Sequence, residues 1–212
     1  MTKKLVKYIA TAAIILVVGY HSIYFKKLGE VKASSSAQQF NAANYARRFW
    51  KEHYVPGMDT AFQLSSLLTL LKTDARTAFD SHSHALGIGN LRYFLVRGEG
   101  TVITRDEDAI RLQLKPDSAM RYVTLTTDMI FGNSVRDATG LINISEFKNT
   151  MDFNNVSAEL NNIVKAEVLP AFLKYVRKGS VVEFVGALEL NQEHLATEAL
   201  EIVPVRLKII QP

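Results

Sequence analysis

The 212-residue sequence contains no cysteine, one tryptophan and five prolines. Without cysteine, the chain forms no disulfide, holds no metal through a thiolate, performs no thiol catalysis and offers no thiol to a lipid. The absence is compatible with an oxidising compartment, because a chain of this length buries a core without disulfides. The sequence also lacks a Gly-x-Ser-x-Gly elbow, a His-Glu-x-x-His pair and a glycine-rich phosphate loop. It therefore predicts no enzyme, no cofactor and no metal.

Positive charge is concentrated in the first 32 residues, which contain six lysines and one acid. Residues 33–212 contain 19 basic and 20 acidic residues. The basic pI of about 9.2 therefore comes from the N-terminal segment. Because the remainder is nearly neutral, its charge argues against nucleic acid as a partner.

The apolar run Tyr8–Phe25 is flanked by lysines on both sides. As a helix, its 18 residues would rise about 27 Å, close to the roughly 30 Å hydrocarbon core of a bilayer. The run predicts a single transmembrane helix in an anchor over residues 1–31, with the lipid bilayer as its partner. The segment also has the basic start and apolar block of a signal peptide, but the nearest small-residue exit, at Ala33, lies too far beyond the block for cleavage.

The orientation of this anchor is weakly determined, because lysines lie on both flanks. A short basic start before an apolar block favours a cytoplasmic N-terminus and an exported body. The prediction is a single-pass protein of the inner (cytoplasmic) membrane whose C-terminal domain faces the periplasm or the cell exterior.

The segment after the anchor is predicted to contain a serine-rich linker over residues 32–40 and a helical hairpin over 41–86. The first helix begins at the N-cap Asn41 and ends at Pro56-Gly57. The second begins at Asp59 and continues to Phe79, with apolar residues recurring every three or four positions.

Residues 87–212 are predicted to form a five-stranded OB-like Greek-key barrel, so that the fold class is α+β. The period of two recurs in five runs, at 94–102, 110–114, 123–126, 182–190 and 200–209. A helix over 155–177 lies between the third and fourth strands, which is the order of an OB-fold. Asn155 would cap this helix, Pro170 would kink it and Gly179 would end it.

Three positions in the strands indicate local distortions of the barrel. Gly98 and Gly100 lie two apart on the inward face of the first strand and predict a sharp bend. Pro204 interrupts the alternation of the last strand and predicts an edge or a bulge.

The irregular segment 131–153 and the residue that follows it contain the candidate binding residues Asn133, Arg136, Asp137 and Asn154. The arginine is a rigid donor fork, the aspartate accepts, and Asn133 does both, so the cluster could hold a carboxylate, a set of sugar hydroxyls or a partner backbone. The structural alternative is favoured: Arg136 and Asp137 would bond within the barrel's own connection, and Asn154 would help to cap the next helix.

Other polar residues give weaker indications. His82 and His84 could ligate a metal, but only Asp80 is nearby and a solvated loop is the preferred interpretation. His53 and His194 are interpreted as surface residues, and His21 as a ring at the membrane interface. Cations alternate with aromatics at Arg92-Tyr93-Phe94, Arg97 and Arg121-Tyr122, as in single-stranded nucleic-acid sites, yet strand alternation sends Tyr93 and Phe94 to opposite faces.

Four segments, 89–94, 130–138, 153–161 and 184–187, resemble an uncharacterised bacterial family of predicted periplasmic lipoproteins, with the similarity extending over residues 35–210. The resemblance implies an OB-like barrel with helical additions, no established activity and genes beside ABC-type sugar uptake systems. The family supplies no functional residues. This chain departs from the lipoprotein description because it has no cysteine, so its anchor would be proteinaceous.

These observations lead to one preferred function and two alternatives. The preferred function is a membrane-anchored, extracytoplasmic, non-enzymatic protein that binds a carbohydrate or an ABC transporter subunit, with a groove near Asn133 and Arg136. The first alternative is a nucleic-acid-binding OB module at the membrane, which requires a basic stripe on the barrel. A hydrolase is the second alternative. It is disfavoured because the sequence shows no nucleophile paired with a general base.

Overall fold

The computed structural model describes residues 3–22, 40–87, 89–114, 122–197 and 199–211. Its contacts divide the chain into two units, Met1–Phe40 and Asn41–Pro212. The predicted linker over 32–40 lies outside the described residues except for Phe40.

The described part of the first unit is mainly helix α1, Lys3–Ser22. Apolar side chains of this helix, such as Ile14, Ile15 and Leu16, are exposed. Among the described residues, no helix is both long enough and apolar enough to cross a membrane, so the predicted transmembrane helix is not found there. The end of the predicted run, 23–25, lies outside the described residues.

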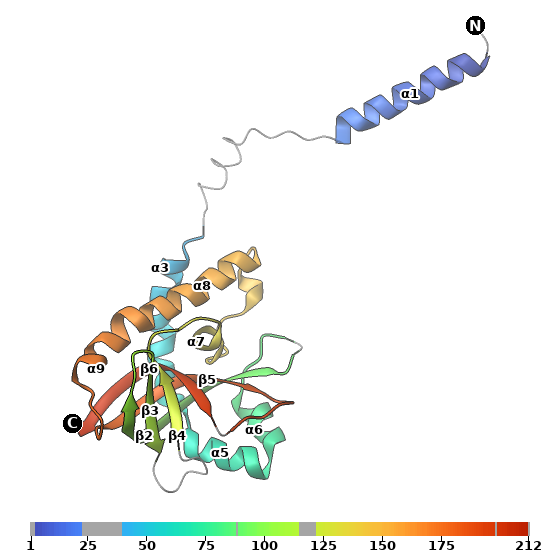
Figure 1. The fold of residues 1–212 in the computed structure, drawn as a ribbon. Coiled ribbons are helices and arrows are strands. Elements are labelled where there is room, and N and C mark those ends of the chain that lie inside the picture. Colours follow the sequence, from blue (N-terminus) through green and yellow to red (C-terminus); the bar gives the residue numbers. More distant parts are fainter. Residues whose placement is uncertain (1–2, 23–39, 88, 115–121, 198, 212) are drawn as a thin grey trace. The chain divides into compact units, whose positions relative to one another are not determined.

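The second unit is built around a barrel (Figure 1). The described strands are β1 Phe62–Gln63, β2 Leu91–Arg105, β3 Ala109–Leu114, β4 Tyr122–Thr126, β5 Val181–Asn191 and β6 Leu200–Gln211. They are ordered β1-β2-β3-β4-β6-β5, and pairing of β2 with β5 closes the last five into a barrel. β4 and β6 run parallel, whereas the other barrel pairs are antiparallel. The predicted OB-like barrel is confirmed.

Side-chain alternation explains why these residues form strands around one core. In β3, Ile110, Leu112 and Leu114 are buried, whereas Arg111 and Gln113 between them are exposed. Buried residues of the other barrel strands fill the interior with one apolar cluster. Its strand members include Phe94, Val96, Val102, Val123, Leu125, Val182, Phe184, Leu188, Leu190, Leu200 and Ile202.

The long strand β2 changes partners where the two glycines lie. It pairs with β5 from Leu91 to Thr101 and with β3 from Gly100 to Arg105. A Cβ atom on Gly98 would lie 2.7 Å from Cζ of Phe184, and one on Gly100 would lie 2.8 Å from the carbonyl oxygen of Gln113. Neighbouring atoms therefore occupy the space of a side chain at both positions, and the sharp bend stays a prediction.

The last strand contains the predicted bulge. Val185 pairs with Arg206 but Gly186 pairs with Pro204, so Val205 is an extra residue in β6. Proline has no backbone N–H to donate to a neighbouring strand, and at a bulge this donor is not needed.

The first helix of this unit begins as predicted, and its α-helical part ends at Pro56-Gly57 as predicted. Helix α3, Ala42–Phe49, is capped by Asn41, whose Oδ1 accepts the Asn44 N–H at 2.8 Å. The chain continues through a π-turn, η1 Trp50–Tyr54, helix α4 Val55–Gly57 and the 3₁₀ turn η2 Met58–Thr60. In the wider turn before the proline, the Val55 N–H bonds to the Trp50 carbonyl.

The second predicted helix is two helices, α5 Leu64–Thr73 and α6 Ala75–His82. Asp59 lies in η2 and does not begin a helix. Asp74 interrupts the run because its carboxylate caps α6, accepting the Thr77 N–H at 3.1 Å and the Thr77 hydroxyl at 2.6 Å. In place of a hairpin between the two predicted helices, α3 packs against α8, and α5 packs against α6 and β2. The leucines of α5 join the barrel core.

The helix between β4 and β5 consists of α8 Thr150–Ile163, the π-turn η4 Val164–Val168 and α9 Leu169–Tyr175. It begins before the predicted cap Asn155, because Asn149 accepts the Asp152 N–H at 2.8 Å. Pro170 follows the π-turn at the start of α9. Gly179, with φ +93°, lies in the turn beyond the helix end.

Candidate functional site

The segment that contains the predicted binding residues is attached to α8. Asn133 precedes the short helix α7, Ser134–Asp137. Its Oδ1 accepts the hydroxyl hydrogen of Ser157 at 3.0 Å, and the Gly132 carbonyl accepts the Asn161 side-chain amide at 3.1 Å. Gly132 adopts φ +81°, a conformation that favours glycine. Two side chains of α8 therefore position the start of α7.

Arg136 and Asp137 form a buried ion pair with each other. Nε and Nη2 of the arginine donate to the two carboxylate oxygens at 2.6 and 2.9 Å, and Nη1 donates to the Phe153 carbonyl at 3.4 Å. The guanidinium also lies 3.5 Å from the centre of the Phe153 ring. Only 1% of Arg136 and 5% of Asp137 is exposed. The structural interpretation accounts for both side chains, and a binding role stays a prediction.

The fourth predicted residue, Asn154, is exposed on α8 next to Phe153. The described residues thus place Arg136 and Asp137 together inside the protein, Asn133 beside α8, and Asn154 on the surface. None of the four lines a described groove.

A groove of about 680 Å³ nevertheless lies beside α7, and Ser134 of that helix lines it. We call it the acidic groove. It extends over β4, β5 and β6 to the β2–β3 turn and the β5–β6 loop. Its lining is Leu91, Asp108, Ala109, Thr124, Thr126, Met129, Phe131, Ser134, Ala187, Glu189, Leu190, Asn191, His194, Ala196, Ala199, Leu200, Glu201 and Val203. Three carboxylates and no lysine or arginine are found among these described residues.

Glu189 is the carboxylate of the acidic groove that neighbouring side chains hold in place. The Ser134 hydroxyl donates to its Oε2 at 3.3 Å. The buried Tyr93 side chain lies near Glu189 and feels its charge. Burial, together with the negative charges of Glu189 and Asp137, raises the pKa of Tyr93 to about 12. The phenol therefore stays protonated at neutral pH and remains a donor.

An apolar rim adjoins these carboxylates. Phe131 and Met129, which follow β4, are 72% and 63% exposed. Asn191, Thr124 and Thr126 add an amide and two hydroxyl groups. An exposed aromatic surface beside convergent polar groups is the usual composition of a small-molecule site.

The histidines do not gather into a metal site. The His82 ring stacks on Phe62 with 3.8 Å between centres, and His84 lies against Gly140. Burial lowers the pKa of His84. His53 is exposed, and the exposed His194 lines the acidic groove. In the part of the chain that the structure describes, no three metal-ligating side chains come together.

The alternating cations and aromatics of β2 do not form one basic face. Tyr93 and Phe94 are both buried, Arg92 donates to Gln192 at 3.0 Å, and Arg97 lines a separate groove. Arg121 lies outside the described residues.

Residues 13–208 match the family model described as Predicted periplasmic lipoprotein (DUF2291), so the chain belongs to this family. The family description indicates an extracytoplasmic location. A crystal structure of an OB-fold protein from Thermotoga maritima is similar to the chain, with a TM-score of 0.73 and 27% identity, over 81% of this chain and 99% of that one. No curated protein matches. The predicted resemblance is confirmed, whereas the association with sugar transporters stays a prediction.

The acidic groove was not predicted residue by residue. Its signals were present: Glu189 is one of two exposed glutamates in a mostly apolar strand, and Phe131 precedes a glycine just after β4. Only the closed barrel brings these segments together, because they are distant in sequence.

Proposed function

We propose that this protein is a non-enzymatic, extracytoplasmic binding protein whose acidic groove holds a neutral carbohydrate, and that it serves as an accessory component of an ABC-type sugar uptake system. The single observation that carries the proposal is the acidic groove, in which carboxylates, an amide and hydroxyl groups surround an exposed aromatic ring.

The lining suits sugar hydroxyl groups. Carboxylate oxygens accept hydrogen bonds from hydroxyl groups, and the Asn191 side chain both donates and accepts. The exposed ring of Phe131 offers an apolar surface for the carbon face of a sugar. Because the described lining contains no lysine or arginine, the groove disfavours phosphates and the nucleic-acid alternative.

The position of Glu189 supports binding with little reorganisation. Its bond to Ser134 holds the carboxylate before a ligand arrives. This partner donates to the carboxylate and does not accept a proton from it. Among the described residues, no histidine side chain is hydrogen-bonded to a serine or threonine that lines the groove, which favours binding over catalysis.

We also propose that the apolar segment Tyr8–Phe25 associates with a lipid bilayer in place of an acylated cysteine. The exposed apolar side chains of α1 support this. Full-length protein should float with liposomes, and the double substitution Ile15→Asp and Val17→Asp should abolish flotation. Flotation that is unchanged in this variant would contradict the proposal.

Carbohydrate binding is tested by calorimetric titration of the full chain with neutral mono- and disaccharides, beside glucuronate and a single-stranded oligodeoxynucleotide. At least one neutral sugar should bind, and Glu189→Gln and Phe131→Ala should each weaken it about tenfold. Matched controls are Glu52→Gln and Met151→Ala, which alter an exposed acid and a side chain as exposed as Phe131 outside the groove. Binding of the oligonucleotide without any sugar would overturn the proposal.

The transport association needs a separate test. Capture of the full chain from solubilised membranes of its own cells should recover a sugar permease or a solute-binding subunit. Capture that repeatedly recovers neither protein would remove the accessory role while leaving carbohydrate binding intact.

A further inference from the structure

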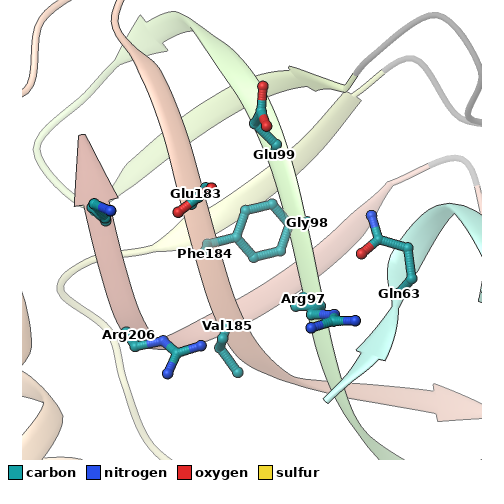
Figure 2. A pocket seen from close by; sticks show the side chains of 9 residues that line it. Gln63, Arg97, Gly98, Glu99, Glu183, Phe184, Val185 and Arg206 are labelled. Carbon is teal, nitrogen blue, oxygen red and sulfur yellow. The ribbon is translucent and has the colours of Figure 1, made fainter. Parts of the chain in front are cut away.

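We propose a second binding site that, unlike the acidic groove, carries both positive and negative side chains. It takes a small zwitterion bearing a carboxylate and an ammonium group. The site is a groove of about 560 Å³ on the outer surface of β2, β5 and β6, beside β1 (Figure 2). We call it the bipolar groove. Its lining is Gln63, Arg97, Gly98, Glu99, Glu183, Phe184, Val185, Arg206 and Lys208. It shares no lining residue with the acidic groove, and the inference does not rest on carbohydrate binding.

The strand register sorts these side chains into two rows. Arg97 pairs with Val185, which pairs with Arg206. Glu99 pairs with Glu183, which pairs with Lys208. The rows are two residues apart along each strand, a distance of about 7 Å. Figure 2 shows the two arginines on one side of Phe184 and Gly98 and the two glutamates on the other.

Glu183 and Lys208 carry opposite charges and pair across β5 and β6, but the other charged pair of this row does not stabilise the sheet. Glu99 and Glu183 are directly opposite each other across β2 and β5, and like charges in such a pair are destabilising. If the residues at positions 183 and 185 were exchanged, a glutamate would lie between Arg97 and Arg206 and could pair with both. Within the described residues, Arg97 and Glu183 make no ion pair. Arg206 contacts the exposed Asp59 at 3.0 Å.

A ligand with two opposite charges satisfies both rows. Two guanidinium groups separated by one strand offer donor forks to a carboxylate. In the other row, the carboxylates of Glu99 and Glu183 attract an ammonium group, and Lys208 lies on the far side of Glu183. A simple anion would meet Glu99 and Glu183, and a simple cation would meet Arg97 and Arg206, so each would be repelled at one end. Between the rows, Gly98 carries no side chain and leaves space for methylene groups.

The probe is 6-aminohexanoate, whose extended chain separates its two charges by about the distance between the rows. Hexanoate and hexylamine carry one charge each at the same length. Amide spectra of the full-length protein should shift at Gly98 and Val185, and 6-aminohexanoate should bind about tenfold more tightly than either control. Equal affinity for all three compounds would overturn the proposal.

Substitutions assign the two ends. Arg97→Gln and Glu183→Gln should each weaken 6-aminohexanoate about tenfold, until it binds no better than a singly charged probe. Arg111→Gln and Glu107→Gln alter exposed charges outside both grooves and should change nothing. Unchanged affinity in both groove variants would overturn the proposal. Displacement of 6-aminohexanoate by a neutral sugar would also overturn it, because the two grooves would then be one site.

Discussion

The acidic groove and the bipolar groove lie on one barrel, yet they are built differently. The acidic groove lies beside loops and α7, and its lining has carboxylates but no lysine or arginine among the described residues. The bipolar groove is formed by paired strands, and the register places both arginines in one row and both glutamates, with Lys208, in the other. The inward residues of the same strands share one apolar core. Outward positions are therefore where this barrel acquires distinct chemistry.

The largest expected effect comes from breaking the buried ion pair of α7, which lies beside the acidic groove only. Arg136→Met would leave the Asp137 carboxylate buried without its partner and should cost about 3–5 kcal/mol of unfolding free energy, measured by urea denaturation. Carbohydrate binding should weaken, whereas 6-aminohexanoate binding to folded protein should persist. The double substitution Arg136→Met and Asp137→Leu should recover part of the loss. A single variant as stable as the double variant would contradict this account of the pair.

A smaller effect is expected beside the bipolar groove. Gly98→Ala would place a Cβ atom 2.7 Å from the Phe184 ring and should cost about 1–3 kcal/mol by overpacking. It should weaken 6-aminohexanoate more than a neutral sugar. Gly87→Ala is the control, since no atom lies within 4 Å of its Cβ position. Equal stability of the two variants would show that the ring moves without cost.

A substitution remote from both grooves should raise stability. The Tyr54 hydroxyl is buried and has no hydrogen-bond partner among the described residues, and burial raises its pKa. Tyr54→Phe removes an unsatisfied polar atom and should add about 1 kcal/mol, measured by thermal denaturation. Tyr45→Phe, which deletes a hydroxyl donating to Glu146 at 3.0 Å, should add nothing. Both grooves should bind as before.

The smallest expected effect is a pH dependence of stability that comes from His84. Burial lowers the pKa of His84 below its usual 6.5. Below 6.5 and above the folded-state pKa, the unfolded chain binds more protons, so stability is lost as the pH falls. His84→Gln should reduce the drop in urea midpoint between pH 7 and pH 5, whereas the exposed His53→Gln should not. An unchanged pH dependence in His84→Gln would assign the effect to other groups.

The sequence predicted the barrel well because alternation is a local signal. The five strands, the Asn41 cap and the bulge at Pro204 all follow from residues and their near neighbours. The prediction of helix boundaries failed where a single capping residue interrupts an apolar periodicity. Asp74 caps a new helix inside an apolar run.

The sites were harder to predict because they depend on distant pairings. Arg136 and Asp137 were recognised as special, and their mutual bonding was the favoured alternative, but adjacency in sequence does not indicate which groove lies beside α7. Glu189 faces Ser134, 55 positions earlier. Arg97 joins Arg206 in one row only after β2, β5 and β6 have paired.

The pairing of β2 with β5 also determines when, during synthesis of the chain, either binding site can form. Arg92 and Gln192, bonded across this pair of segments, are 100 positions apart. At synthesis rates of about 5–20 residues per second, β2 waits roughly 5–20 seconds for its partner. Until then its edge is open to other chains. Both grooves require β5, so neither ligand can be bound before the last part of the barrel has been made.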